Sequence, residues 1–326
     1  MRKHLTRFLP ALLLVLQSPP AFASDFDKYL ELSSKTRVQE ERLKYASKAI
    51  ESWDYECGEK KLAQAYFSRA IAYSFLEEYE KAVADYNKYE ELEGENYRLF
   101  SNRAAAYVGL KKYEEALSEY ARAKNILFGP DYNGDPKIKA VPLKGVCQVY
   151  CMTGEYDKAV KNCREAVKIN PQYDQAYAQL GIIYLLKKDY KKSMEYFYKA
   201  MENANLNKEK HVAKFNIKKD CYHIAEHYHF IGWNYYLQGK TVSADKYFSR
   251  SLGCSGDYWG PYLGMALLSD KKNEMKKMKK YFEKALKLNP KIKEESYFRG
   301  NPQFPIVTPG LAKDIRQAVN LYYYSE

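Results

Sequence analysis

One short stretch of the chain concentrates side chains that could bind a metal ion or act on a substrate. Residues 221–229 read CYHIAEHYH, with His223 and His227 four positions apart and Glu226 between them. On a helix, two imidazoles at this spacing can ligate zinc, and a neighbouring glutamate can serve as a general base. His229 is a further candidate ligand. The stretch therefore raises the hypothesis of a metal-dependent hydrolase at His223, Glu226 and His227.

The rest of the sequence offers little support for this chemistry. No downstream helix supplies a convincing glutamate as the third metal ligand, and no catalytic domain surrounds the stretch. The chain also lacks a phosphate-binding glycine loop, a Gly-x-Ser-x-Gly elbow and a dinucleotide fingerprint. We therefore favour polar residues at the start of an ordinary helix, and expect no enzyme activity, no bound metal and no cofactor.

The first 23 residues have the layout of a secretory signal peptide. Arg2, Lys3 and Arg7 form a positive leader, residues 8–16 are apolar, and the sequence AFA at 21–23 fits the rule for cleavage sites. We expect cleavage after residue 23 and export of the remaining chain to a periplasm or to the outside of the cell. The apolar run is short for a bilayer, so we expect no transmembrane span after cleavage.

The positive charge of the chain is concentrated near its C-terminus. The 326 residues carry a net charge of +12, and the window Lys271–Lys293 holds ten lysines against Glu274 and Glu283. Such a face could hold an anionic lipid or polymer of the cell envelope, or it could simply be solvated. Nucleic-acid binding is not favoured, because export is expected and no recognisable nucleic-acid motif is present.

Residues 96–126 show how the chain would position these side chains. Two amphipathic halves of helical period flank a short turn near 111–112. Small residues let two antiparallel helices approach closely, and aromatic residues fill the space beside them. The residues that carry this pattern are Phe100, Ala104 and Tyr107 in the first half, and Tyr113, Ala116, Tyr120 and Ala123 in the second.

This helical hairpin recurs along the chain and resembles the tetratricopeptide repeat (TPR) family. The equivalent second-helix positions are Ala82, Ala116, Ala159, Ser193, Ala244 and Met278, spaced by 34, 43, 34, 51 and 34 residues. A 34-residue period of helical hairpins is the signature of that family. The resemblance implies an all-α protein, an α-solenoid (superhelix) of about six to seven TPR-like hairpins with a C-terminal capping helix.

The pattern divides the chain into four parts. After the signal peptide at 1–23, residues 24–60 form a degenerate first repeat and a loop, and residues 61–290 hold six TPR-like repeats. The two long spacings predict insertions near 128–138 and 203–220. Residues 291–326 form a connector punctuated by prolines, followed by the capping helix over about 311–323.

Six cysteines in an exported protein favour disulfide bonds. Cys221 and Cys254 flank the fifth hairpin, whose antiparallel helices would bring the two ends together. Cys147 and Cys163 occupy facing positions in the third hairpin. The alternative is that all four are reduced, small core residues, and Cys147 and Cys163 do stand where the family uses a small residue and an aromatic one.

In the TPR family, the first helices of the stacked hairpins line a concave groove that binds peptides. If this chain behaves alike, its groove would bind another protein or a peptide. Asn102 also resembles one residue of a carboxylate-binding clamp, but the other clamp positions depart from the pattern. The groove predicted from the resemblance is lined by Phe67, Ile71, Phe75, Asn102, Lys144, Gln148, Ile182, His229, Trp233 and Tyr236.

These observations favour a non-catalytic scaffold that binds a peptide or partner protein in the concave groove. The first alternative is an envelope-surface adaptor that uses the Lys271–Lys293 face. The more remote alternative is the metal-dependent hydrolase. Fold alone does not name the partner.

Overall fold

The computed structural model describes residues 24–215, 221, 224–294 and 309–324, and these residues form helices, turns and loops without a strand. The predicted signal peptide lies outside the described residues. Within the described residues, seven helical hairpins follow one another, and a further helix comes last. The hairpins are α1 (Asp25–Lys35) with α2 (Gln39–Glu51), α3 (Glu59–Phe75) with α4 (Tyr79–Glu93), α5 (Tyr97–Gly109) with α6 (Tyr113–Phe128), α7 (Ala140–Met152) with α8 (Tyr156–Ile169), α9 (Asp174–Leu186) with α10 (Tyr190–Phe215), α11 (Ala225–Leu237) with α12 (Thr241–Cys254), and α13 (Trp259–Lys271) with α14 (Met275–Leu288); the final helix is α16 (Pro309–Tyr324).

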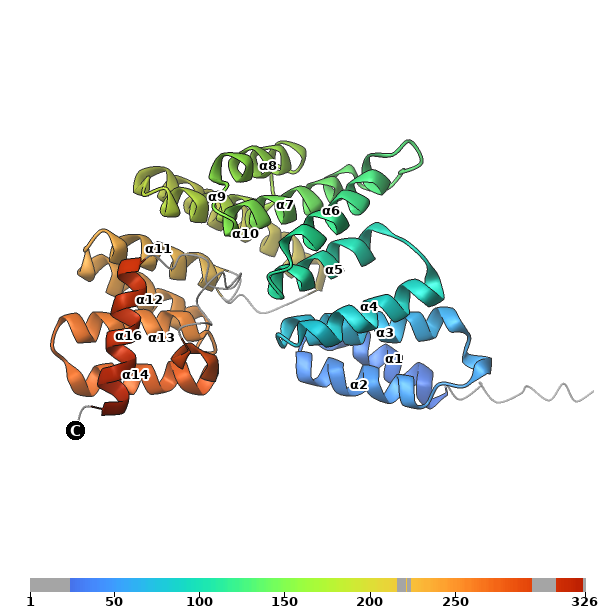
Figure 1. The fold of residues 1–326 in the computed structure, drawn as a ribbon, viewed down its shortest axis with the longest axis horizontal. Helices are drawn as coiled ribbons and strands as arrows, with labels where there is room; N and C mark the ends of the chain where they lie inside the picture. Colours follow the sequence, from blue (N-terminus) through green and yellow to red (C-terminus); the bar gives the residue numbers. More distant parts are fainter. Residues whose placement is uncertain (1–23, 216–220, 222–223, 295–308, 325–326) are drawn as a thin grey trace, which may run out of the picture.

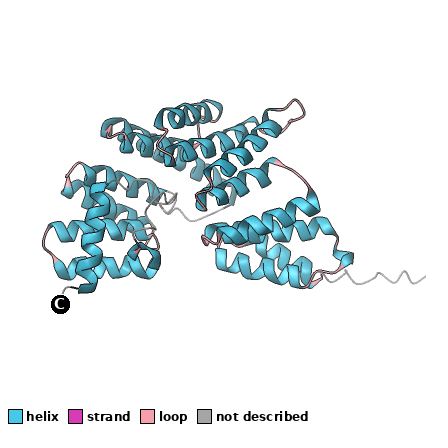
Figure 2. Cartoon of the chain, in the orientation of Figure 1, coloured by secondary structure: helices cyan, strands magenta, loops and turns pink. Residues whose placement is uncertain are grey.

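The hairpins stack along a curved arch. In Figure 1, α1–α4 lie at one end of the arch, α5–α10 form its middle, and α11–α14 lie at the other end. Figure 2 shows that loops occur only where one helix gives way to the next in the described chain. The predicted all-α solenoid of six to seven hairpins is confirmed.

Six hairpins, from α3/α4 to α13/α14, turn in the same way. One residue between the two helices has positive φ: Glu77, Lys111, Gly154, Lys188, Gly239 and Asn273. The amide of the next residue then donates to a carbonyl near the end of the first helix, as from Glu78 to Tyr73 at 2.8 Å and from Lys112 to Tyr107 at 2.9 Å. This is the Schellman arrangement, which satisfies the last carbonyls of the first helix.

A second recurring contact holds the helices of five hairpins together. A small residue on the first helix faces an aromatic residue 16 positions later, as Gly232 faces Phe248. A Cβ atom on Gly232 would lie 2.6 Å from Cδ1 of Phe248, so the approach requires glycine there. The equivalent pairs are Ala70 with Tyr86, Ala104 with Tyr120, Gly181 with Phe197 and Ala266 with Phe282; Cys147 and Cys163 stand at this position in the α7/α8 hairpin.

The two long spacings have different structures. The first holds a turn-rich connection after Phe128 and the short 3-10 helix η2 (Pro136–Lys139), over the range where an insertion is predicted. In the second range, α10 continues as helix to Phe215 and is 26 residues long, whereas sequence analysis predicts a weakly patterned insertion from 203. Residues 216–220 lie outside the described chain.

The buried side chains are not distributed evenly. One continuous cluster runs from Cys147 in α7 to Ala318 in α16. The N-terminal hairpins hold smaller, separate clusters, around Phe26, around Phe100 and around Tyr120. The hydrophobic core is therefore largest in the C-terminal half of the arch.

Helix α16 covers the last hairpins. Its residues Leu311, Ile315 and Ala318 are buried, at the spacing of one helix face. Asp314 accepts a hydrogen bond from the Tyr236 hydroxyl at 2.6 Å and lies 3.3 Å from the Lys271 ammonium. In Figure 1 this helix crosses α13 and α14, with which it makes contacts. Among the described helices, none is long and apolar enough to cross a membrane.

Candidate functional site

A cavity of about 670 Å³ lies inside the arch. Its walls come from the first helices of four hairpins, α3, α7, α9 and α11, and from the turn between α12 and α13. The residues that line it are Phe75, Lys144, Gln148, Asp174, Gln175, Ala178, Gln179, Ile182, Ala225, Glu226, His227, Phe230, Ser255, Asp257 and Tyr258. Polar and charged side chains outnumber the apolar ones in this lining, and a concave surface where several polar groups converge is a candidate ligand-binding site.

Helical spacing explains why these side chains converge. On α9, Asp174, Ala178 and Ile182 are four residues apart and therefore lie on one face. Lys144 and Gln148 repeat this spacing on α7, and the Lys144 ammonium donates to Gln148 Oε1 at 3.4 Å. Each first helix thus presents one stripe to the interior, while its other faces pack against the neighbouring helices.

Two charged groups of the cavity, Lys144 and Glu226, have shifted pKa values. Removal of water by the surrounding protein lowers the pKa of Lys144, and the negative charges of Glu226 and Asp174 partly offset this shift. The same loss of water raises the pKa of Glu226, which the Lys144 charge partly offsets and the Asp174 charge reinforces. These three groups therefore interact electrostatically across α7, α9 and α11.

Four of the predicted groove residues line this cavity. They are Phe75, Lys144, Gln148 and Ile182. Phe75 is 65% exposed, which is a high fraction for a large aromatic side chain. The structure brings these four together from three different hairpins.

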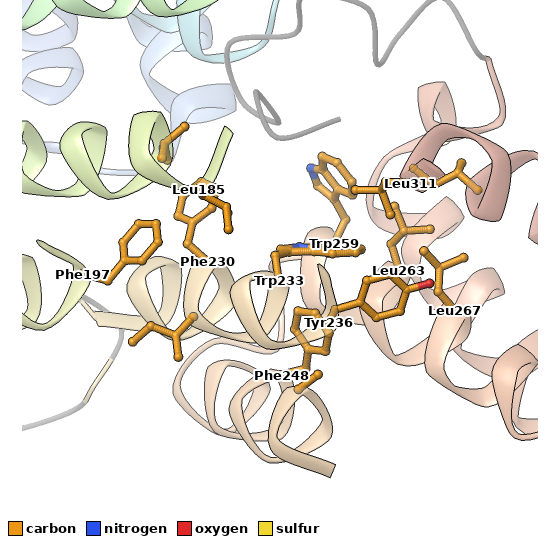
Figure 3. Close-up of a cluster of buried hydrophobic side chains, with 14 of the residues drawn as sticks. Leu185, Phe197, Phe230, Trp233, Tyr236, Phe248, Trp259, Leu263, Leu267 and Leu311 are labelled. Carbon is orange, nitrogen blue, oxygen red and sulfur yellow. The ribbon is translucent and has the colours of Figure 1, made fainter. Parts of the chain in front are cut away.

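Three other predicted groove residues are buried in the core, so the prediction is wrong for His229, Trp233 and Tyr236. Trp233 has no exposed surface, and its ring packs edge-on against Phe248 at 5.1 Å between ring centres. Figure 3 shows Trp233 and Tyr236 among the buried side chains of the cluster that includes Leu311 of α16. The reason is that α12, α13 and α16 enclose α11, and Tyr236 bonds to α16 through Asp314.

The remaining predicted groove residues serve their own hairpins. Phe67 is half-buried and packs against the rings of Tyr86 and Tyr89 at 5.6 and 4.9 Å. Asn102 donates from Nδ2 to the Arg98 carbonyl at 2.8 Å, within its own helix. Ile71 is half-buried. None of the three lines the cavity.

The candidate metal ligands do not form one site in the described chain. His229 is fully buried beside Tyr258 and Trp233, and burial lowers its pKa to about 3. Glu226 faces the cavity and His227 is buried in its wall. His223 lies outside the described residues. Among the described residues, no group of three or more His, Cys, Asp or Glu side chains is placed to hold a metal ion.

Both predicted cysteine pairs are joined in the structure. Cys147 in α7 and Cys163 in α8 form one disulfide, with Cα atoms 5.4 Å apart. Cys221 and Cys254 form the other, with Cα atoms 4.8 Å apart, at the open end of the α11/α12 hairpin. Cys57 and Cys151 are free thiols, and burial raises the pKa of Cys151 to about 12.

Sequence reasoning missed several residues of the cavity. Asp174 lies four residues before Ala178, and Glu226 four residues before Phe230, so helical spacing could have found them. Ser255, Asp257 and Tyr258 lie in the turn between α12 and α13, where periodicity gives no signal.

Comparisons with known proteins agree with this architecture. A family model described as a TPR repeat matches residues 148–188, and one described as a tetratricopeptide repeat matches residues 63–96, 174–205 and 261–292. No curated protein matches the chain.

Three solved structures are similar in fold. A tetratricopeptide repeat protein from Parabacteroides merdae superposes with a TM-score of 0.56 at 13% identity, over 90% of this chain and 98% of that one. The Cut9–Hcn1 hetero-tetramer of the APC/C gives a TM-score of 0.54 at 12% identity, over 90% of this chain and 55% of that one. PilW, a type IV pilus biogenesis factor, gives 0.51 at 14% identity, over 72% and 94%. The chain therefore carries tetratricopeptide repeats over residues 63–96, 148–205 and 261–292.

Proposed function

We propose that this protein is a non-catalytic scaffold that binds a segment of another protein in its interior cavity, in a periplasm or outside the cell. The TPR fold is in general a protein-interaction scaffold. The observation that carries the proposal is the cavity itself, because four hairpins contribute side chains to one concave surface. The export signal expected at residues 1–23 supports the location.

The lining suits a peptide rather than a small polar metabolite. Phe75, which is 65% exposed, offers apolar surface, and Gln148 and Gln175 offer amide groups that can pair with a peptide backbone. These side chains come from α3, α7 and α9, so an occupant would contact three hairpins at once.

The test is a crosslinking pull-down with residues 24–326 as bait, comparing the wild type with Gln175→Trp. Gln175 is exposed in the cavity wall, so tryptophan there should fill the cavity without disturbing the core. Val242→Trp is the matched control, because Val242 is 82% exposed on α12 and does not line the cavity. We expect a partner that both wild type and Val242→Trp recover and Gln175→Trp loses. Equal recovery with all three baits would contradict the proposal.

The envelope-surface adaptor is a second candidate. Exposed lysines cover α14 and the short 3-10 helix η4 (Pro290–Lys293) that follows it, among them Lys276, Lys280, Lys284, Lys287 and Lys293. Ion pairs reduce the free charge of the face, since Lys271, Lys272, Lys277 and Lys291 each have a carboxylate partner.

This candidate predicts sedimentation with anionic vesicles that falls as salt is added, because exposed charges are screened. Reversal of Lys276, Lys280, Lys284 and Lys287 to glutamate should abolish the sedimentation. Binding that survives this change would count against the adaptor.

A further inference from the structure

The interior cavity has a charge opposite to that of the whole chain. Three carboxylate side chains line it, Asp174, Glu226 and Asp257, against the single ammonium of Lys144. The chain as a whole carries a net charge of +12. The negative excess is therefore a property of this concave surface and not of the composition.

Two of these carboxylates lack a partner. In the described part of the chain, neither Glu226 nor Asp257 makes a hydrogen bond or an ion pair. The positive charge of Lys144 acts on Glu226 only through space, where it lowers the pKa of that carboxyl. Lys144 instead donates to Gln148. Both side chains are exposed in the cavity wall, so a cation brought by a ligand can reach them and form a charge-assisted hydrogen bond.

A buried amide in the same wall also lacks a partner. Gln179 is only 7% exposed and lines the cavity, and its Nε2 makes no hydrogen bond of ordinary geometry, although the amide lies beside the Cys151 thiol. Buried polar groups in proteins are nearly always paired, so such a group calls for an explanation. The carbonyl oxygen of a bound peptide is a chemically suitable acceptor for it.

The ends of the arch limit what can enter. Glu77, two residues beyond the cavity residue Phe75, forms an ion pair of 2.9 Å with Lys291 at the far end of the solenoid. Because the two ends are joined, a narrow, extended segment fits the interior better than a folded surface does.

We propose that the cavity binds an extended segment of a partner protein that carries a lysine or arginine. The cation lies against Glu226 and Asp257, and an apolar neighbour in the segment packs on Phe75, which is 65% exposed. This inference rests on the proposed function and adds the chemistry of the partner. A segment with an acidic anchor, held by Lys144, is the outcome that the test must separate from it.

The test uses fluorescein-labelled heptapeptides of glycine, alanine and leucine with one central residue that is lysine, norleucine or glutamate. Their binding to residues 24–326 is measured by fluorescence anisotropy at low salt. We expect the lysine peptide to bind about ten-fold more tightly than the norleucine peptide, as for one charge-assisted contact. Glu226→Gln should remove most of that difference. Glu283→Gln, at an exposed carboxylate of α14 outside the cavity, is the matched control.

Each outcome decides something. Equal binding of the lysine and norleucine peptides, lost in Gln175→Trp, would overturn the charge preference and leave the proposed function standing. If the glutamate peptide binds most tightly, the preference for a cation is overturned, and an acidic anchor held by Lys144 replaces it. Failure of every peptide to bind, or binding that Gln175→Trp does not affect, would overturn both the inference and the proposed function.

Discussion

Glu77 and Lys291 are 214 positions apart in the chain, yet their side chains form an ion pair of 2.9 Å. Glu77 belongs to the turn between α3 and α4, and Lys291 to the short helix η4 that follows α14. The pair therefore joins the first full repeat to the end of the last, so that the arch closes around its cavity. The Glu77 side chain is only 17% exposed, which reduces screening by solvent.

Reversing either charge should open the arch. We expect Glu77→Lys and Lys291→Glu each to increase the radius of gyration measured by small-angle X-ray scattering, and the double exchange to restore it. Lysine suits the backbone at position 77, because Lys111 and Lys188 occupy the same positive-φ site in other hairpins. Raising the salt concentration should open the wild type in the same way. Identical scattering from all four proteins would show that other contacts hold the ends together.

The positive-φ turn residues make a prediction about stability. A non-glycine residue in this conformation costs roughly 1–2 kcal/mol of folding free energy. Glycine avoids that cost, but ordering its more flexible unfolded backbone offsets part of the benefit. Lys188→Gly should therefore raise the free energy of unfolding by up to about 1 kcal/mol, and Gly154→Ala should lower it by about 1 kcal/mol. Urea denaturation measures both changes.

The control for these turns is a lysine of ordinary helical conformation. Lys191→Gly, in the exposed first turn of α10, should destabilise the protein by up to about 1 kcal/mol. If glycine had the same effect at positions 188 and 191, backbone strain in the turn would not be the cause.

The cysteines provide a direct chemical test. With both disulfides formed, the unfolded, unreduced protein should expose two thiols, Cys57 and Cys151, out of six cysteines. In the folded protein only Cys57 should be alkylated readily, since Cys151 is buried and its raised pKa of about 12 leaves almost no thiolate. Mass spectrometry after alkylation counts the thiols. A count above two would show that at least one bond does not form in solution.

The bond between Cys147 and Cys163 stands where other repeats pack a small residue against an aromatic one. Cys147→Ala with Cys163→Ala should cost roughly 3 kcal/mol for the closed loop, plus the space left empty. Cys147→Ala with Cys163→Phe restores the pairing seen at Ala266 and Phe282 and should recover the packing part of the loss. Chemical denaturation compares the two. Equal stability of both variants would mean that packing at this position contributes nothing.

His229 should make the protein sensitive to acid. Burial lowers its pKa in the folded state to about 3, whereas an unfolded histidine has a pKa of about 6.5. As pH falls below 6.5 the unfolded chain takes up a proton that the folded protein refuses, so stability decreases down to about pH 3. Between pH 7 and pH 5 this amounts to about 2 kcal/mol.

His229→Gln should remove that contribution, because the amide can still accept the hydrogen bond of 3.2 Å from the Trp233 indole but does not titrate. The measurement is urea denaturation of both proteins at pH 7 and at pH 5. A variant that loses as much stability as the wild type between these two values would contradict the assignment.

The sequence predicts the repeats well because their determinants are local. The spacing of Ala82, Ala116 and Ala159 sets the hairpins, and each hairpin closes through contacts between its own two helices, 16 residues apart for Cys147 and Cys163 and 33 for Cys221 and Cys254. The facing positions of Cys147 and Cys163 follow from the same register. One part of the site is also local, because Lys144 and Gln148 lie one turn apart on α7.

The rest of the site depends on contacts that the repeat pattern does not contain. Trp233 and Tyr236 occupy groove positions in the register, but α16 arrives from far along the chain and covers that end, with Asp314 bonding Tyr236. Closure of the arch depends on the curvature accumulated over all the hairpins, which decides whether Glu77 meets Lys291. Neither the contact of α16 with Tyr236 nor the ion pair that closes the arch can be recognised from the periodicity of the sequence.

The uneven core has a consequence for how the molecule unfolds. Because one cluster of buried side chains runs from α7 to α16, those hairpins should lose structure together, as a single cooperative unit. The first hairpins, with their smaller clusters, should open more often and exchange their amide protons faster. Phe75 lies in the less stable N-terminal part, while Glu226 and Asp257 lie in the more stable C-terminal part. An occupant of the cavity would thus bridge the two parts and slow the opening of the N-terminal end.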